Sequence, residues 1–149
     1  MRVLGVSGSL RRDSYNTRLL RAAAELLPEG VELELWDGLR AVPPYDQDDD
    51  VDPAPAAVAA IRAAIAGADA VLFATPEYNS SVPGALKNAL DWASRPIATN
   101  VLRNKPVAVG HAPERFDGEG RLVDDDLREQ LAEVVETLVA EAAPALVAA

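Results

Sequence analysis

The chain has 149 residues, the size of one ordinary domain, which excludes a large multi-domain protein. Hydrophobic residues make up 49% and charged residues 26% of the sequence, as in a folded globular protein rather than a disordered or fibrous one. The 14 basic and 24 acidic residues give a net charge of −10, which disfavours binding to nucleic acid or to an anionic membrane.

Some kinds of functional site are excluded because the residue types that they need are missing or rare. Without cysteine the chain has no disulfide, no thiolate nucleophile and no cysteine-based zinc site, and a single histidine is too few for most transition-metal sites. We therefore expect no bound metal. The N-terminal apolar run is too short for a signal sequence, and the apolar stretch 56–74 is interrupted by Arg62 and Asp69. These features predict a cytoplasmic protein.

The N-terminal part of the chain predicts a strand, a helix and a second strand. The apolar run 3–6 is typical of a buried strand, and apolar residues at helical spacing follow it until Pro28 and Gly30 end the helix. In residues 31–37 apolar and polar side chains alternate, which predicts a strand at the edge of a sheet with one buried face. That face consists of Val31, Leu33 and Leu35.

After a long connection rich in proline and aspartate, the pattern returns to alternating helices and strands. An alanine-rich helix is expected over 56–66 and a strand buried on both faces over 70–75. Pro83 suits the first position of a helix that continues to residue 94. The inward side chains of this helix are expected to be Leu86, Ala89, Leu90 and Ala93, and the outward ones Lys87, Asn88 and Asp91.

The C-terminal part predicts one more strand and one more helix. Residues 106–110 read as a buried strand, and the last helix is amphipathic. Its apolar stripe consists of Leu127, Leu131, Val134, Val135 and Leu138. The alternation of strands and helices along the whole chain predicts an α/β fold around a parallel sheet.

The Ser/Gly turn after the first predicted strand carries groups that suit an anion. Gly8 lets the backbone approach a ligand closely, serine hydroxyls and unpaired helical N–H groups can donate, and Arg11 or Arg12 adds a positive charge. A phosphate would use all of these groups together. Taken alone, the turn is equally consistent with Ser14 or Asp13 simply capping the helix. It lacks the spacing of a P-loop or of a dinucleotide-binding turn, which favours a smaller phosphate ligand.

The loop 75–81 follows the third predicted strand and should lie beside this turn. Open α/β sheets bind ligands at the carboxyl ends of strands where the strand order reverses. Prolines stiffen the loop, Asn79 tolerates unusual backbone geometry, and Tyr78 offers an aromatic surface, which together suit a flat heteroaromatic ring. A rigid solvated loop is the plain alternative for Tyr78. For Glu77 we expect a structural hydrogen bond rather than acid/base catalysis.

Two other kinds of site fit the sequence poorly. A serine hydrolase would need Ser9 or Ser80 as nucleophile with His111 as base and an acid such as Asp91, but the Gly-x-Ser-x-Gly elbow is missing. The aspartates within 46–52 lack the glycine and glutamate positions of a calcium-binding EF-hand, so we interpret them as a solvated acidic loop.

Two long stretches carry a family resemblance. The first is Gly8-Ser9-Leu10-Arg11, followed by Ser14 and Asn16. The second is Pro76-Glu77-Tyr78-Asn79 with Ser81, Pro83-Gly84, Leu86-Lys87-Asn88-Ala89 and Asp91-Trp92. In order and spacing they resemble the two signatures of the NADPH-dependent FMN reductase family, flavodoxin-like enzymes that include quinone, chromate and azo-dye reductases. The resemblance covers the chain to about Gly110 and returns at 120–122 and the last helix.

The resemblance implies a cofactor and its site. FMN would be held through its phosphate and ribityl end by Ser9, Arg11, Ser14 and Asn16. Its isoalloxazine ring would be lined by Pro76, Glu77, Tyr78, Asn79 and Ser81. NADPH or NADH would be the co-substrate, and no catalytic protein residue is required because the flavin carries the redox chemistry. Residues 1–149 would form a single flavodoxin-like FMN-binding domain, a three-layer sandwich whose parallel sheet has the strand order 2-1-3-4.

The sequence departs from the family after the fourth predicted strand. Family members continue with a glycine-rich flavin-contacting loop, a helix and a fifth strand, whereas here Val109-Gly110-His111 runs almost directly into 112–116. A unit of roughly 30 residues is therefore absent. Either the deletion is genuine or the sequence omits a stretch. We favour an omitted stretch, and with it a fifth strand, because an open apolar sheet edge is costly.

The resemblance also implies the partners of the protein. Related proteins form dimers or tetramers, so a homodimer or homotetramer is expected. A quinone, an azo compound, a metal oxyanion or free flavin could each be the electron acceptor, and no basic pocket in the sequence separates NADPH from NADH. The alternatives are a flavin-binding electron carrier and, if the shortened C-terminal part is genuine, a ligand-free α/β interaction module.

Overall fold

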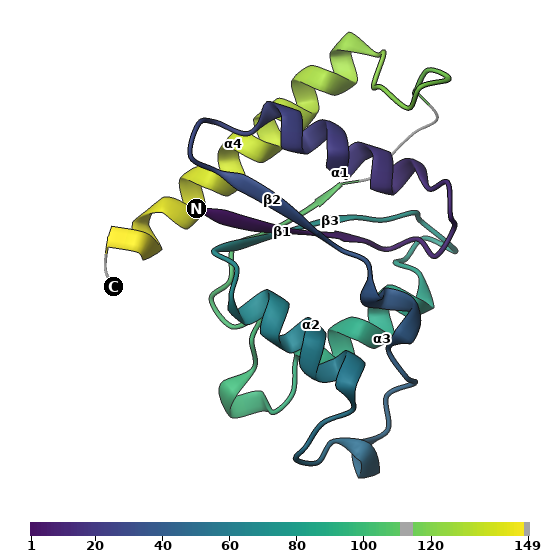
Figure 1. Cartoon of the computed structure of the whole chain (residues 1–149), viewed down its shortest axis with the longest axis vertical. Coiled ribbons are helices and arrows are strands. Elements are labelled where there is room, and N and C mark those ends of the chain that lie inside the picture. The colour runs from purple at the N-terminus through teal and green to yellow at the C-terminus, as the bar shows by residue number, and fades with distance from the viewer. Residues whose placement is uncertain (111–114, 148–149) are drawn as a thin grey trace.

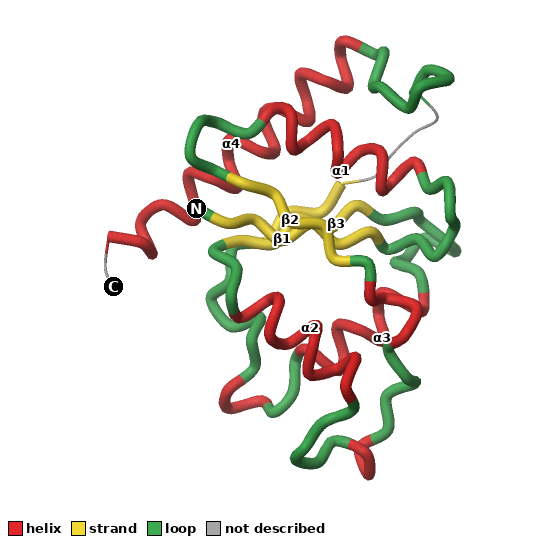
Figure 2. The backbone as a smooth tube through the Cα atoms, in the orientation of Figure 1, coloured by secondary structure: helices red, strands yellow, loops and turns green. Residues whose placement is uncertain are grey.

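A four-stranded parallel sheet lies between two layers of helices in the computed structural model, which describes residues 1–110 and 115–147 (Figures 1 and 2). The strands are β1 (Arg2–Ser7), β2 (Glu32–Trp36), β3 (Ala70–Ala74) and β4 (Val107–Gly110). The helices are α1 (Tyr15–Leu26), α2 (Ala56–Ala66), α3 (Gly84–Ala93) and α4 (Asp125–Val147). The order β2-β1-β3-β4, with parallel pairing throughout, confirms the predicted sheet.

Each face of the sheet has its own apolar core. Helices α1 and α4 cover one face, and α2 and α3 cover the other (Figure 1). The first core includes Val3, Leu20, Leu72, Leu131 and Val135, and the second includes Leu4, Val6, Ile61, Leu86 and Trp92. Because β1 and β3 contribute side chains to both cores, their sequences are apolar at successive positions instead of alternating.

The long connection between β2 and α2 is attached to α3 by polar side chains. The predicted outward position of Asn88 is wrong: it is half-buried, its Nδ2 donates to the carbonyl oxygen of Pro43 (2.8 Å), and its Oδ1 accepts from the backbone N–H of Tyr45 (2.7 Å). Trp92 is fully buried, and its Nε1 also donates to Pro43 (2.9 Å). At the other end of α3, Pro83 precedes the first helical residue rather than occupying that position.

Both edge strands are less buried than their sequences predict. Leu35 of β2 is 39% exposed, although Leu33 packs against the first core. In β4, Val107 and Val109 are 42% and 60% exposed, so the prediction of a buried strand is wrong. These two valines pair with Val71 and Phe73 of β3, which belong to the second core, but the valines themselves are not part of that core.

The expectation of an omitted stretch with a fifth strand is also wrong. The numbered chain continues from β4 to residue 115 through four residues outside the described part, and the described residues form four strands in the sheet. The missing unit is therefore absent from this chain, and β4 is a sheet edge. No helix in the described ranges is both long and apolar enough to cross a membrane.

Candidate functional site

The loops after β1 and β3 meet at one edge of the sheet. They leave the sheet side by side because β1 and β3 are parallel neighbours. The backbone N–H of Gly8 donates to the carbonyl oxygen of Ala74 (2.8 Å), which ties the first loop to the end of β3. A Cβ atom at Gly8 would lie 2.4 Å from Oγ1 of Thr75, far inside contact distance. Only glycine at this position lets the two loops approach so closely.

The serines of the first loop accept hydrogen bonds from the backbone. Oγ of Ser9 accepts from the N–H of Arg11 (3.2 Å), and Oγ of Ser14 accepts from the N–H of Asn16 (3.1 Å). The interpretation of Ser14 as the helix cap is therefore confirmed. A hydroxyl that accepts one hydrogen bond still has its own proton to donate, so capping and anion binding are compatible at both serines.

Asn16 is a buried polar side chain whose hydrogen bonding is incomplete. It is 6% exposed, and its Oδ1 has no hydrogen-bond partner within the described residues. An unpaired buried polar atom costs about 1–3 kcal/mol, so such atoms point to a missing partner. Asn16 lies in the first turn of α1, where unpaired N–H groups already favour an anion. A ligand that carries hydroxyl groups beside a phosphate fits this position, since a hydroxyl can donate to Oδ1 and phosphate oxygens can accept from the side-chain NH₂ group.

Arg11 is placed beside this helix end by an aromatic contact that the sequence did not suggest. Its guanidinium carbon lies 5.3 Å from the ring centroid of Tyr15, within the range of cation–π attraction. Tyr15 in turn stacks on Phe116, with ring centroids 5.8 Å apart. Phe116 is far away in sequence, and no pattern in either segment pairs the two rings.

The turn that carries Phe116 is fixed by a charged side chain. Oδ1 of Asp117 accepts from the backbone N–H of Arg121 (2.9 Å) and Oδ2 accepts from the guanidinium of the same residue (2.9 Å). These bonds, the backbone one above all, lower the pKa of Asp117 from its usual value. Near neutral pH the carboxylate therefore stays ionised and keeps its hydrogen bonds to the turn.

The second loop is a rigid reverse turn. Tyr78 and Ser81 exchange two backbone hydrogen bonds (2.9 and 3.1 Å), and between them Asn79 and Ser80 have φ values of 53° and 60°. The prediction of unusual backbone geometry at Asn79 is confirmed. The side chain of Tyr78 is exposed. Glu77 is exposed too and makes no hydrogen bond within the part of the chain described, so the structural role expected for it is wrong.

A hollow of about 310 Å³ opens between this turn and the end of β4. It is lined by Thr75, Pro76, Glu77, Ser80, Ser81, Val82, Val109 and Gly110. Its volume lies within the roughly 300–1,000 Å³ of typical small-molecule pockets. Its lining combines apolar surface with hydroxyl and backbone polar groups, which suits a flat ring with polar edges. The predicted ring residues Pro76, Glu77 and Ser81 line it directly.

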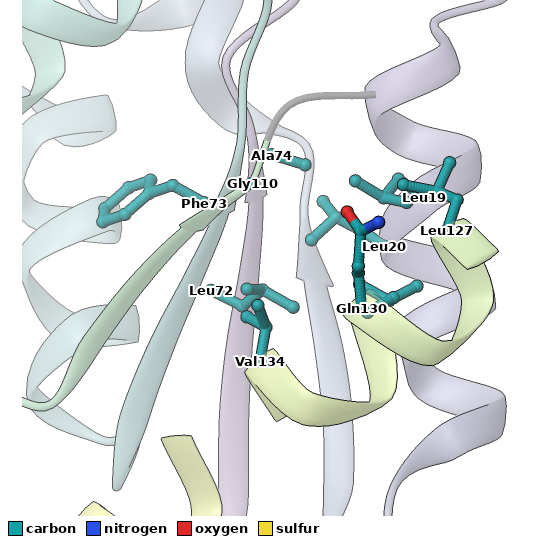
Figure 3. Close-up of a pocket in the computed structure, with 10 residues that line it drawn as sticks. Leu19, Leu20, Leu72, Phe73, Ala74, Gly110, Leu127, Gln130 and Val134 are labelled. Atoms are coloured by element: carbon teal, nitrogen blue, oxygen red, sulfur yellow. The ribbon is translucent and has the colours of Figure 1, made fainter. Parts of the chain in front are cut away.

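A separate apolar pocket lies beneath the same edge of the sheet. Figure 3 shows it between α1, α4 and the ends of β3 and β4, where several leucines and Val134 surround it and Gln130 contributes a polar side chain. Its volume of about 130 Å³ is small for a cofactor. None of the predicted site residues lines it, and we regard it as a packing defect of the first core.

Two acidic residues of the alternative sites are engaged in ion pairs. Asp91 forms an ion pair with Lys87 (2.5 Å) on α3, and Asp50 pairs with Arg62 (2.9 Å). His111 lies outside the described residues. Within the described residues, no group of three or more acidic or histidine side chains is suited to a metal ion.

Comparison with known proteins gives consistent matches. The sequence profile of the NADPH-dependent FMN reductase family matches residues 1–148. An NAD(P)H-dependent FMN reductase of Pseudomonas aeruginosa is 36% identical over 173 positions, covering 93% of each chain. A 2-hydroxy-1,4-benzoquinone reductase of a Burkholderia species is 47% identical over 109 residues, 73% of this chain and 58% of that protein. The structure of FerB, a flavoenzyme NAD(P)H:(acceptor) oxidoreductase of Paracoccus denitrificans, has a TM-score of 0.81 at 29% identity, covering 96% of this chain and 97% of FerB.

The length of the Pseudomonas match bears on the size of the missing unit. The Pseudomonas match has 173 positions, but 93% of the 149 residues here is about 139, so about 34 positions are gaps in this chain. A gap of this size agrees with the absence of a unit of roughly 30 residues.

We expect Gly8→Ala to destabilise the protein. The added Cβ would collide with buried Thr75, and overpacking of this kind costs about 1–3 kcal/mol. The measurement is the free energy of unfolding from urea denaturation. Gly84→Ala is the matched control, since a Cβ there meets no atom within 4 Å. Equal stability of Gly8→Ala and the wild type would show that the loops do not meet as tightly as described.

Proposed function

Because the chain belongs to the NADPH-dependent FMN reductase family, we propose that it is an FMN-dependent NAD(P)H oxidoreductase that reduces quinones and flavins. The observation that carries this proposal is the family match over residues 1–148, together with two adjoining loops suited to a phosphate and to a flat ring. The flavin, when bound, supplies the two-electron exchange with the nicotinamide and the acceptor. The protein acts as a single FMN-binding domain.

The phosphate and ribityl end of FMN is assigned to the loop after β1. Ser9 and Ser14 donate their hydroxyl protons to it, because their oxygens already accept from the backbone. Arg11 contributes a charged hydrogen bond. Asn16 gains the partner that its side-chain oxygen lacks within the described residues.

The ring is assigned to the turn after β3. Pro76, Glu77 and Ser81 line the hollow, and the hydrogen-bonded turn keeps this wall rigid. Tyr78 and Asn79 belong to the same turn without lining the hollow, and we assign them to the ring as well. A preformed wall needs no ordering when the ring binds, which favours affinity. The role of these residues is to bind and orient the ring, and the proposal assigns no acid, base or nucleophile to the chain.

The described residues leave the ring hollow open beside β4, and this affects which electron acceptors can enter. Val109 and Gly110 of the sheet edge line the hollow. An open site excludes few flat or small oxidants. Azo compounds and metal oxyanions are therefore proposed as acceptors besides quinones and free flavin, and either NADPH or NADH as the donor.

The protein is proposed to work as a homodimer or homotetramer in the cytoplasm. The exposed valines of β4 and the open backbone edge of this strand favour association with a second copy. A chain without cysteine needs no oxidising compartment for disulfides, which fits a cytoplasmic location.

Anaerobic titration tests the reductase proposal. The protein is saturated with FMN, separated from free flavin and mixed with NADPH. We expect the visible absorbance of oxidised flavin to disappear and to return when a benzoquinone is added. Bound FMN that NADPH does not reduce would contradict the proposal and indicate an electron carrier. A colourless protein whose melting temperature FMN does not raise would contradict it and indicate a ligand-free module.

Arg11→Ala tests the phosphate assignment. Loss of a charged hydrogen bond should weaken FMN binding by about 1.5–3 kcal/mol, measured by fluorescence titration of the apoprotein. Arg103→Ala is the control, since this exposed arginine precedes β4 and lies at the opposite end of the strands. Unchanged affinity in Arg11→Ala would remove this residue from the site.

Val109→Lys tests the assembly. A charged side chain on the exposed face of β4 should oppose pairing at this edge and shift the protein toward a monomer, as measured by light scattering. The control is Val123→Lys, an equally exposed valine outside the strands. A wild-type protein that is monomeric at high concentration would refute the proposed assembly.

A further inference from the structure

A second hollow lies on the other side of the loop after β1. Its volume is about 410 Å³, and it is walled by the ends of β1 and β2, the first turns of α1 and the short 3₁₀ turn Gly38–Ala41. Four arginines line it: Arg11, Arg12, Arg21 and Arg40. Asp37 is the acidic residue of the lining. These residues come from segments about thirty positions apart, which is why the sequence alone reveals no basic pocket.

This hollow is positively charged, whereas the chain as a whole is negatively charged. Four of the 14 basic residues gather here in a protein with a net charge of −10. Across the described ranges, no carboxylate forms an ion pair with any of the four guanidinium groups. Like charges held close together repel each other, and a bound anion would relieve the repulsion. Guanidinium groups match phosphate oxygens in a bidentate geometry.

The positions of the arginines are partly fixed before any ligand binds. Nη2 of Arg40 donates to the carbonyl oxygen of Leu10 (2.6 Å), which links the turn after β2 to the loop after β1. Arg21 projects from α1 on the same side, two turns after the helix begins. Neither residue belongs to the loop assigned to FMN, so they offer positive charge in addition to what that loop provides.

Apolar surface lies next to the arginines. Leu10 and Leu35 are 40% and 39% exposed in this hollow, and the half-buried ring of Trp36 forms part of its lining. The backbone of Gly38 packs on that ring, since a Cβ there would lie 2.5 Å from Cζ2 of Trp36. A bare inorganic anion gains nothing from such a surface, whereas a nucleoside carrying phosphates could use both parts.

The strand order separates this hollow from the flavin hollow. In the order β2-β1-β3-β4 the arginine hollow lies toward β2, and the ring hollow follows β3 and β4. The loop after β1 stands between them, with Ser9 and Arg11 on the side of the arginines as well. One loop can therefore contact two anionic ligands at once.

We propose that the arginine hollow binds the adenosine 2′-phosphate part of NADPH, and that Arg21 and Arg40 select NADPH over NADH. This assignment rests on the proposed NAD(P)H oxidoreductase function. The 2′-phosphate is the group that NADH lacks, and at neutral pH it carries most of two negative charges. Arginines without carboxylate partners recognise that group, and the neighbouring leucines and tryptophan supply apolar surface for the adenosine.

Calorimetry of the FMN-saturated protein tests the proposal. The probes are 2′,5′-ADP and 5′-AMP, which differ by the 2′-phosphate. We expect 2′,5′-ADP to bind roughly tenfold more tightly or better. The variant Arg21→Ala keeps the bond between Arg40 and Leu10, so it should lose much of that preference while its FMN affinity and melting temperature stay unchanged. The double variant Arg21→Ala/Arg40→Ala should lose the rest of the preference. The preference in kcat/KM for NADPH over NADH should fall by a similar factor. Arg103→Ala should keep both preferences.

Several outcomes would overturn the proposal. Equal affinity for the two probes would show that the 2′-phosphate is not recognised. Displacement of FMN by 2′,5′-ADP would show that the arginines belong to the FMN phosphate site. If flavin reduction fails but 2′,5′-ADP binds selectively through Arg21 and Arg40, the ligand assignment stands and the oxidoreductase function alone is refuted. The two proposals can thus fail separately.

Discussion

The parallel pairing of β1 with β3 is the constraint on which the whole site depends. It brings two loops that are more than sixty residues apart in sequence to the same end of the sheet, where the connection from β1 leads outward to β2 and that from β3 leads outward to β4. With a larger residue at position 8, a side chain would stand between the two loops despite this pairing. Gly8 removes that obstacle, so the polar groups of one loop and the rigid turn of the other can contact a single ligand.

The second family signature contains two kinds of residue. Its first part forms the turn between Tyr78 and Ser81 and faces the ring hollow. Its second part, through Asn88 and Trp92, holds the long connection after β2 by three hydrogen bonds to Pro43 and Tyr45. Burial of the tryptophan ring makes that attachment stable. The signature therefore combines residues that contact ligand with residues that shape the scaffold behind the arginine hollow.

Residue patterns within one element could be predicted from the sequence, while relations between elements could not. The helix 56–66 has the predicted bounds, and Asn79 has the predicted positive φ. The burial of residues 106–110 could not be predicted, because an apolar run of this kind occurs both in a central strand and in a strand at the edge of a sheet. Here a deletion makes the strand an edge. The Tyr15–Phe116 stack and the arginine hollow join distant segments, and no local periodicity reports such contacts.

The uneven distribution of charge affects how the loop after β1 binds its two proposed ligands. The net negative charge of the protein repels the anionic cofactor and co-substrate that it is proposed to bind. The four arginines of the arginine hollow make the potential positive at the place where these ligands are proposed to bind. Because Arg11 lines the arginine hollow and is also assigned to the FMN phosphate, the charges brought by the two ligands act on the same guanidinium group. Each ligand neutralises part of the positive field that attracts the other. Arg21 and Arg40, which stand outside the FMN loop, provide the additional charge that allows both anions to be held together.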